Sequence, residues 1–257
     1  MASKRWSRDE LILAFNLYCK IPFGRIDMHN PEIISLAKIL GRSPAAVSWK
    51  LANFARLDPS LKKRNIAGAS HGSKLDEAVW NEFSRDWAGL AFESERLLAD
   101  RSRTSVESIA EIDPADLPPR GKERDAMVRV RVNQAFFRRA VLAAYDFRCC
   151  ITGLAVPELL VASHIVPWSR DVVNRVNPRN GLLLNALHDR AFDLGLLTIT
   201  PNFVVKVSPG LLKKSRDGSP AAALLAESDG FPMRLPQKFL PEAAFLRYHN
   251  RYVYRSR

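Results

Sequence analysis

The segments SHIVPW (163–168) and NPRNGLLLNALHDRAFDLG (177–195) decide the fold of the second half of the chain. β-Branched residues before a proline predict a strand that ends soon after His164. The turn residues NPRN and the apolar run GLLL that follows them predict a second strand. The last part has helical spacing and ends in glycine, which predicts a helix of about two turns that closes at Gly195. The expected order is strand, loop, strand and helix.

Three polar side chains fall at the junctions of this unit. His164 ends the first expected strand, Asn180 starts the second, and His188 lies at the start of the helix. An imidazole with an ordinary pKa of about 6.5 can take a proton from water near neutral pH, and a neutral imidazole can bind a divalent ion. Asn180 cannot act as a base, but its amide can bridge backbone groups and hold the strands in register. The pattern favours metal-assisted hydrolysis, with a buried core histidine as the alternative for His164.

These residues are similar to the HNH endonuclease family, whose motif forms the ββα-metal fold. The form HIVPW, NGLLL and HDxAFDxG resembles an HNH subgroup of bacterial restriction endonucleases, and the resemblance extends from about residue 121 to the C-terminal LRYHNRYVY segment. It implies that His164 is the general base that activates water, that Asn180 organises the hairpin, and that His188 binds a single catalytic Mg²⁺ or Mn²⁺ ion. The products would carry 3′-hydroxyl and 5′-phosphate ends.

One departure from the family pattern concerns the metal ligands. Many HNH proteins have Asp or His directly before the base as a second ligand, whereas this chain has Ser163. Asp189 and Asp193 are the candidate replacements, and a plain helix-surface carboxylate is the alternative for each. Asp193 lies five residues after His188, which is not the same helical face, so it could bind only if the helix ends there.

A second departure concerns zinc. Many relatives hold structural zinc on CxxC pairs, but here Thr152 occupies the position three residues after Cys149. No structural zinc is therefore expected, and Cys149 and Cys150 are interpreted as small buried apolar residues. The chain has 3 cysteines, two of them adjacent, so no disulfide framework is expected either.

Capping residues predict three helices near the N-terminus. Ser7, Asn30 and Ser43 are cap residues, and a proline follows the last two directly. The third helix is expected to end near Leu57. The short GRS turn, residues 41–43, separates the second helix from the third, which is the layout of a helix-turn-helix domain.

The third of these helices is the one that such a domain offers to the DNA major groove. Its polar positions, which are the candidate DNA contacts, are Ser48, Lys50, Asn53 and Arg56. Residues 5–57 resemble the Myb/SANT type of three-helix domain, with a tryptophan at the start of the first helix and a GRSPxxV turn that opens the third. The resemblance implies DNA binding, although some relatives bind protein, and a plain helical bundle is the alternative.

Composition divides the chain into three parts, and the expected fold class is α+β, an all-α domain joined to a ββα-metal domain. The parts are residues 1–74, a basic three-helix domain that ends in a linker at 58–74; residues 75–120, one amphipathic connecting helix at 75–100 and a polar linker; and residues 121–257, the HNH nuclease domain.

Within the third part, the alternating segment VRVRV, residues 128–132, predicts a short strand.

The charge distribution favours nucleic acid as a partner. The formal net charge is +12, and two basic ends flank an acidic stretch at residues 75–100. Lys and Arg supply most of the non-specific affinity for phosphates, so double-stranded DNA is the expected partner, with a basic protein of another use as the alternative. Arg170 and Arg179 are among the arginines beside the strand–loop–strand unit that could grip phosphate.

The sequence as a whole predicts a cytoplasmic, metal-dependent endonuclease that cuts duplex DNA. It lacks an apolar run long enough to span a membrane, and its first ten residues lack the apolar core of a signal peptide. A restriction role is expected, with dependence on modified DNA as an option. The main alternative is a DNA-binding regulator with a degenerate, inactive HNH domain, which Ser163 favours, and a third is an RNA-directed nuclease. One ββα unit cuts one strand, so a double-strand cut would need a homodimer.

Overall fold

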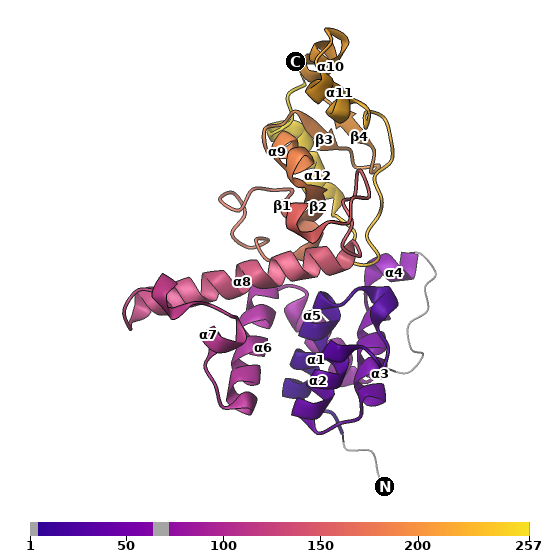
Figure 1. Cartoon of the computed structure of the whole chain (residues 1–257). Coiled ribbons are helices and arrows are strands. Elements are labelled where there is room, and N and C mark those ends of the chain that lie inside the picture. Colours follow the sequence, from indigo (N-terminus) through magenta and orange to yellow (C-terminus); the bar gives the residue numbers. More distant parts are fainter. Residues whose placement is uncertain (1–4, 64–71, 257) are drawn as a thin grey trace. The chain divides into compact units, whose positions relative to one another are not determined.

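The fold class is α+β, as the sequence predicts (Figure 1). The computed structural model describes residues 5–63 and 72–256 of the chain. Contacts between Cα atoms divide the chain into two units, Met1–Ala144 and Tyr145–Arg257, and the strands found in the described residues all belong to the second. The compositional division at residues 74 and 120 stays a prediction.

The described residues of the first unit form helices and turns. Its elements are α1 (Arg8–Lys20), α2 (Pro31–Leu40), α3 (Pro44–Ala55), α4 (Pro59–Lys63), α5 (Lys74–Phe83), α6 (Trp87–Ser102), α7 (Val106–Ile109) and α8 (Lys122–Ala144), with 3-10 turns at Phe23–Arg25 and Pro114–Asp116. Across both units, every described helix is too short or too polar to cross a lipid bilayer.

The three predicted N-terminal helices are confirmed, and the residues that cap them are those that the sequence marks. The Ser7 hydroxyl accepts the backbone N–H of Glu10 (3.3 Å), and the Glu10 carboxylate accepts the backbone N–H of Ser7 (2.9 Å). Asn30 and Ser43 cap α2 and α3 with side-chain acceptors. Helix α3 ends at Ala55, slightly earlier than predicted.

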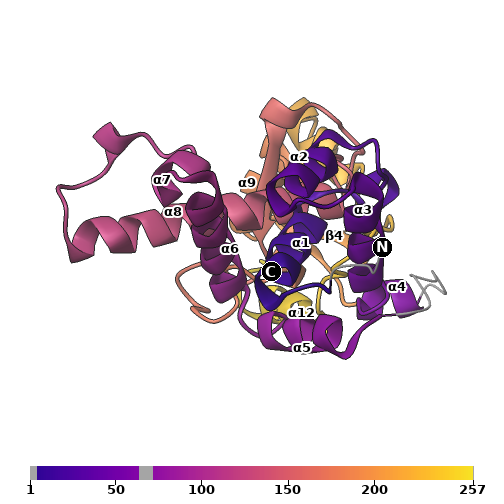
Figure 2. The same ribbon diagram turned by 90° about the horizontal axis from the view of Figure 1, so that it is seen from below.

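Helix α1 lies at the centre of the first unit. Figure 2 shows it among α2, α3, α5 and α6, and it also contacts α8. A helix with neighbours on most sides needs apolar residues around most of its circumference, and the run Leu11–Phe15 is buried throughout. The Phe15 ring stacks on Phe54 of α3 at 4.8 Å between centroids and lies 4.9 Å from Trp80 of α5. This aromatic cluster is the core of the unit.

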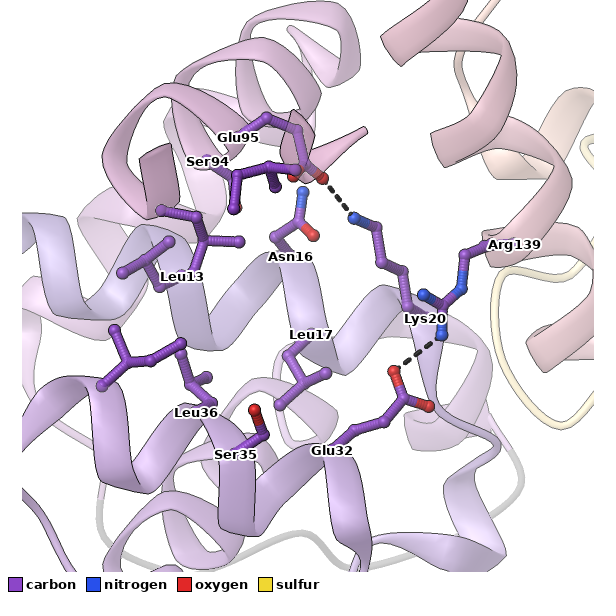
Figure 3. A pocket seen from close by; sticks show the side chains of 13 residues that line it. Leu13, Asn16, Leu17, Lys20, Glu32, Ser35, Leu36, Ser94, Glu95 and Arg139 are labelled. Carbon is purple, nitrogen blue, oxygen red and sulfur yellow. Dashed lines mark hydrogen bonds and ion pairs between the residues drawn. The ribbon is translucent and has the colours of Figure 1, made fainter. Parts of the chain in front are cut away.

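Two ion pairs near the C-terminal end of α1 link helices of the first unit, one between α1 and α6 and one between α8 and α2 (Figure 3). Lys20 Nζ lies 2.6 Å from Glu95 Oε1 of α6, and Arg139 of α8 lies 2.6 Å from Glu32 Oε2 of α2. The four residues border a cavity of about 250 Å³ that is otherwise lined mainly by leucine and isoleucine. The Arg139–Glu32 pair is exposed, and exposed pairs contribute about 0–1 kcal/mol, so apolar packing carries most of the stability here.

The segment predicted as one connecting helix, residues 75–100, is two helices. Helix α5 ends at Phe83, and Asp86 starts α6 by accepting the backbone N–H of Gly89 (2.9 Å). Both helices pack against α1, so this acidic segment is part of the helical unit. The prediction of a single helix was wrong because the apolar spacing continues across the break, whereas the aspartate cap decides it.

The strand predicted at residues 128–132 is also wrong, because this segment lies inside α8. Val128 and Val132 are buried and Val130 is exposed, a pattern that fits an alternating strand and one face of a helix equally well. Phe136 is buried at the next four-residue step, so the stripe continues with the helical period. The longer run decides the structure, and the five-residue window was too short to show it.

The segment predicted as a linker, residues 58–74, is partly helical. Pro59–Lys63 form α4, and Lys74 begins α5. The remaining part of that prediction falls largely on residues 64–71, which lie outside the described residues.

The second unit contains the predicted strand, loop, strand and helix in that order. Strand β1 pairs antiparallel with β2, from Leu160 opposite Asn185 to His164 opposite Gly181, and α9 packs against both strands. A second antiparallel pair, β3 with β4, follows. The elements are β1 (Leu160–His164), β2 (Gly181–Asn185), α9 (Ala186–Asp193), β3 (Leu197–Ile199), β4 (Val205–Val207), α10 (Pro209–Arg216), α11 (Pro220–Ala226) and α12 (Ala243–Tyr252), with 3-10 turns at Pro157–Leu159 and Pro178–Asn180.

His249 fastens the C-terminal helix α12 to α9 and β3. Its Nε2–H donates to the Phe192 carbonyl (3.1 Å), its Nδ1 accepts the Thr198 hydroxyl (2.7 Å), and its ring stacks on Phe192 at 3.6 Å between centroids. Burial lowers the pKa of His249 to about 4, although the bond to the Phe192 carbonyl opposes the shift. The ring is therefore neutral at pH 7, and both of its nitrogens are used in packing this end of the unit.

Candidate active site

The β1–β2 hairpin and α9 carry the three junction residues of the sequence motif. His164 is the last residue of β1, Asn180 directly precedes β2, and His188 lies in the first turn of α9. Each of these positions is set by an element boundary, so the hydrogen bonds at those boundaries determine how the side chains are held.

Asn180 ties the loop after β1 to the start of β2. Its side chain is fully buried, at 0% exposed. Its Oδ1 accepts the backbone N–H of Val166 (2.8 Å), and its Nδ2 donates to the carbonyls of Val166 and Asn174 (3.2 Å each). An amide is suited to this position because it offers an acceptor and two donors together.

His164 stands where β1 ends, and one of its ring nitrogens is held by the loop. Nε2 lies 2.8 Å from the Arg175 carbonyl oxygen, which can only accept, so we assign the proton to Nε2 and the basic lone pair to Nδ1. Burial lowers the pKa of His164 below its ordinary value, and the bond to the Arg175 carbonyl opposes this shift. The ring is therefore neutral at pH 7 and able to accept a proton on Nδ1.

Trp168 and Arg175 fix the loop that carries this carbonyl. The Trp168 ring meets the His164 ring edge-on at 5.5 Å between centroids, and the Arg175 guanidinium lies 5.1 Å from the centre of the Trp168 ring. Arg175 Nε also donates to the Trp168 carbonyl (2.8 Å). The contact of Arg175 with His164 could not be predicted from the sequence, because the contact is made by a backbone carbonyl, which every residue type has.

The N-terminus of α9 fixes the second histidine. Asn185 caps the helix, and its Oδ1 accepts both the backbone N–H (2.9 Å) and the Nδ1–H (3.0 Å) of His188. The lone pair is then on Nε2, which is buried and has no hydrogen-bond partner in the described residues. Burial also lowers the pKa of His188. A neutral imidazole whose other nitrogen is oriented by an oxygen acceptor is the form that binds metal ions.

Two carboxylates of α9 interact with each other, and one of them lies near the residue before the candidate base. Burial raises the pKa of Asp189, while the nearby Ser163 hydroxyl and the Arg190 charge lower it. Burial, and then the charge of Asp189, raise the pKa of Asp193. The two aspartates are four residues apart and so share a helical face, which differs from that of His188. A cation bound there would relieve the charge of both.

The donors on this face fit a divalent ion that keeps most of its own water. Ser163 Oγ is buried and lies outside hydrogen-bonding geometry with any described partner, although it is close enough to Asp189 to lower the pKa of that carboxylate. Mg²⁺ is commonly held by one or two carboxylates, with water and substrate phosphate completing its shell. Within residues 5–63 and 72–256, no three His, Cys, Asp or Glu side chains form a fuller metal-binding cluster.

The structure gives His188 and Asp189 different neighbours. His188 lines a cavity of about 210 Å³ together with Thr152, Phe231 and Glu227, which directly follows α11. Asp189 instead lies beside Ser163 of β1. Sequence reasoning did not single out Glu227, which lies far along the chain and in no recognisable motif. Of the predicted ligands, the two aspartates are thus brought together, and His188 is set apart from them.

The adjacent cysteines pack under the hairpin. Cys149 Sγ accepts the backbone N–H of Asn185 (3.3 Å), and the backbone N–H of Cys150 donates to the Leu183 carbonyl (2.7 Å). Both are fully buried free thiols, which confirms their interpretation as small core residues.

The predicted phosphate contacts of the second unit differ in their surroundings. Arg170 is exposed and forms no ion pair with the described residues. Arg179 lies 3.6 Å from Glu242, and its backbone carbonyl accepts the Glu242 N–H (3.3 Å). Arg170 is therefore the more accessible of the two cations.

The predicted DNA contacts of α3 are divided between its surface and its packed side. Lys50 is 7% exposed and lies 2.8 Å from Asp76 of α5, and Asn53 Nδ2 donates to the same carboxylate (3.4 Å). Arg56 pairs with Glu77 (3.0 Å), and Ser48 is half-buried. In this structure Lys50 and Asn53 join α3 to α5, and the role of all four residues in DNA binding stays a prediction.

One comparison with known proteins bears on this region. Residues 149–200 match the sequence model of a family described as HNH endonuclease. The matched span contains β1, β2, α9 and β3, and so all three junction residues and both aspartates. No curated protein sequence matches the chain.

Proposed function

We propose that the chain is a metal-dependent endonuclease that hydrolyses phosphodiester bonds in duplex DNA, with the HNH-like segment as its catalytic part. The observation that carries the proposal is the orientation of the His164 ring at the end of β1. Its Nε2–H is bound to the Arg175 carbonyl, which leaves the lone pair on Nδ1. The match of residues 149–200 to the HNH endonuclease model supports the reaction class.

His164 is the general base in this proposal. Its Nδ1 takes a proton from the attacking water, and the ring becomes an imidazolium whose Nε2–H bond to the Arg175 carbonyl is strengthened by the new charge. Burial keeps the ring neutral before the reaction, so the base is in its active form at neutral pH. The water attacks phosphorus, the 3′ oxygen leaves, and the products carry 3′-hydroxyl and 5′-phosphate ends.

Asp189 and Asp193 are the residues that would hold the metal ion, either Mg²⁺ or Mn²⁺. Asp189 lies beside Ser163, the position where related nucleases carry a ligand, and so can replace it. When bound, the ion would neutralise charge that develops on the phosphodiester and on the leaving oxygen. His188, the ligand that the family resemblance implies, is the alternative metal-binding residue, through its unsatisfied Nε2. Asn180 positions the hairpin through its three bonds to backbone groups.

The helical first unit would supply DNA binding, and the whole chain would serve restriction of foreign DNA. The predicted contacts whose side chains are the more accessible are Ser48 of α3, Arg56 directly after α3 and Arg170 of the β1–β2 loop. A homodimer would allow both strands to be cut.

A second candidate function is a DNA-binding regulator with an inactive HNH domain. Two observations favour it: Ser163 replaces a metal ligand, and no cluster of three metal-binding side chains occurs within the described part of the chain. This candidate predicts DNA binding without cleavage under any metal condition.

A plasmid-nicking assay in Mg²⁺, Mn²⁺ or EDTA decides between the two. We expect His164→Ala to lower the cleavage rate by about 10²–10⁴-fold, the usual contribution of a general base. Asp189→Asn should raise the metal concentration needed for half-maximal cleavage. His29→Ala, which changes an exposed histidine of the first unit, should match the wild type. Equal nicking by the wild type and His164→Ala would remove the nuclease assignment. Binding without nicking by the wild type would favour the regulator.

Two additions to this assay test the substrate. Competition between duplex DNA and RNA of the same sequence should leave the RNA uncut. Plasmids from several modification backgrounds, followed by mapping of the ends, should reveal whether modified bases are required and should give 3′-hydroxyl and 5′-phosphate termini.

A further inference from the structure

Two adjacent valines in the β1–β2 loop are largely exposed to solvent. Val172 is 67% exposed and Val173 is 79% exposed. Single exposed apolar residues are ordinary on protein surfaces, but a contiguous pair beside a functional site indicates a contact surface. The pair lies two residues before Arg175, whose carbonyl holds His164. The tip of the loop is therefore close in the chain to the candidate base.

Side-chain hydrogen bonds tie this tip to the hairpin. The Asp171 carboxylate accepts the backbone N–H (3.1 Å) and the Nδ2 (2.8 Å) of Asn174. Asn174 Oδ1 in turn accepts Asn177 Nδ2 (3.1 Å), and its carbonyl accepts Asn180 Nδ2 (3.2 Å). This chain of amides runs from the start of β2 to both sides of the two valines, so it sets their position relative to the hairpin.

The residues that flank the tip match the chemistry of a DNA groove. Arg170 is exposed on one side, and Arg175 lies on the other. The one carboxylate between them, that of Asp171, is occupied by Asn174. A DNA groove has phosphates along its two edges, and a partly unstacked base step exposes apolar base faces within it, so two cations around an apolar tip are complementary to it.

We propose that Val172 and Val173 form an apolar wedge that enters the DNA groove beside the scissile phosphate and partly unstacks one base step. The inference rests on the proposed endonuclease function, since the wedge acts on the same substrate. Pyrimidine–purine steps unstack most easily, so the wedge would make cleavage prefer TA and CA/TG steps next to the cut, without hydrogen bonds to the bases.

The first test compares cleavage by the wild type with the double variant V172A/V173A. On intact duplex we expect kcat/KM to fall by about tenfold or more, because the unstacking that the wedge assists costs a few kcal/mol per step. On a duplex with a mismatch already at that step, the loss should be clearly smaller. Mapped cut sites should lose their preference for pyrimidine–purine steps. Val156→Ala, an exposed valine before β1, is the matched control and should behave as the wild type.

The second test reads unstacking directly and needs no cleavage. A duplex with 2-aminopurine at the step beside the cut is bound by His164→Ala, with and without V172A/V173A. We expect fluorescence to rise on binding with the valines present and to stay low without them. Both side chains are exposed, so the substitutions leave the core intact, and equal thermal melting curves would verify this.

The outcomes separate this inference from the proposed function. Failure of the wild type to cleave any DNA would overturn both. Cleavage with the same rate, step preference and fluorescence in V172A/V173A would overturn the wedge alone. A change of oligomeric state in V172A/V173A, with unchanged fluorescence, would assign the tip to a contact between protein chains and overturn the wedge as well.

Discussion

His164 and His249 differ in exposure and in neighbours, since His249 is 1% exposed and His164 is half-buried at the end of a strand. Each donates Nε2–H to a backbone carbonyl, and burial lowers the pKa of each. The Nδ1 of His249 accepts the Thr198 hydroxyl, which uses its lone pair in packing. His164 instead lies at a strand end in a loop with exposed residues, where substrate can approach. Residue type alone therefore does not distinguish a candidate base from a core histidine, whereas the place of the ring in the fold does.

The lowered pKa of His164 leads to a testable pH dependence. The folded-state pKa lies below the ordinary value of about 6.5, so the neutral, active ring is present at pH 7 and is lost as the pH falls through the lowered pKa. We expect kcat/KM to be level around pH 7 and to fall about tenfold per unit at lower pH. A pH–rate profile at fixed metal concentration, with DNA affinity measured at the same pH values, checks this. A midpoint above pH 7 would contradict it.

At the scale of elements, the cap and turn residues that the sequence marks predict their boundaries correctly. The sequence marks Ser7, Asn30 and Ser43 as cap residues, and α1, α2 and α3 start directly after them. The hairpin and α9 followed from a proline, a turn and a closing glycine. One error, a strand inside α8, came from a five-residue segment that fits the period of a strand and that of a helix equally well. The other error, one helix in place of α5 and α6, came from apolar spacing that continues across the break, where the Asp86 cap starts a new helix.

Gly195 ends α9 at a point where the C-terminal segment crosses it, and its replacement should destabilise the second unit. Its φ is +69°, and a Cβ would overlap the Val253 carbonyl oxygen. We expect Gly195→Ala to lower the free energy of unfolding by about 2 kcal/mol or more, from left-handed strain and from the clash. Gly210→Ala is the control, because its Cβ would meet nothing within 4 Å and α10 gains a better helix former. Urea denaturation should separate the two variants, and equal stabilities would rule out this account of Gly195.

At the scale of the whole molecule, proximity that depends on tertiary packing could not be predicted from sequence. The approach of Asp189 to Ser163 requires α9 to pack on β1, and the burial of Lys50 requires α5 to bring Asp76 beneath α3. Neither partner is marked by a motif. The junction residues His164 and Asn180 were predictable because their positions depend on a hairpin that is local in sequence. Motifs therefore locate the candidate reacting groups, and tertiary packing decides which other side chains lie near them.

The net charge of +12 predicts a steep salt dependence of DNA binding, because each phosphate neutralised by Lys or Arg releases counterions. We expect affinity for a non-specific duplex to fall by about 10³-fold between about 50 and 200 mM salt, as for proteins with about six phosphate contacts. Arg170→Gln should reduce the slope of log K against log salt by about one contact, because this arginine is exposed beside the loop tip. Arg96→Gln removes an exposed arginine that already pairs with Asp100 on α6, and it should leave the slope unchanged. Fluorescence anisotropy titrations across salt concentrations measure these slopes, and a flat response in the wild type would show that the basic charge does not serve DNA.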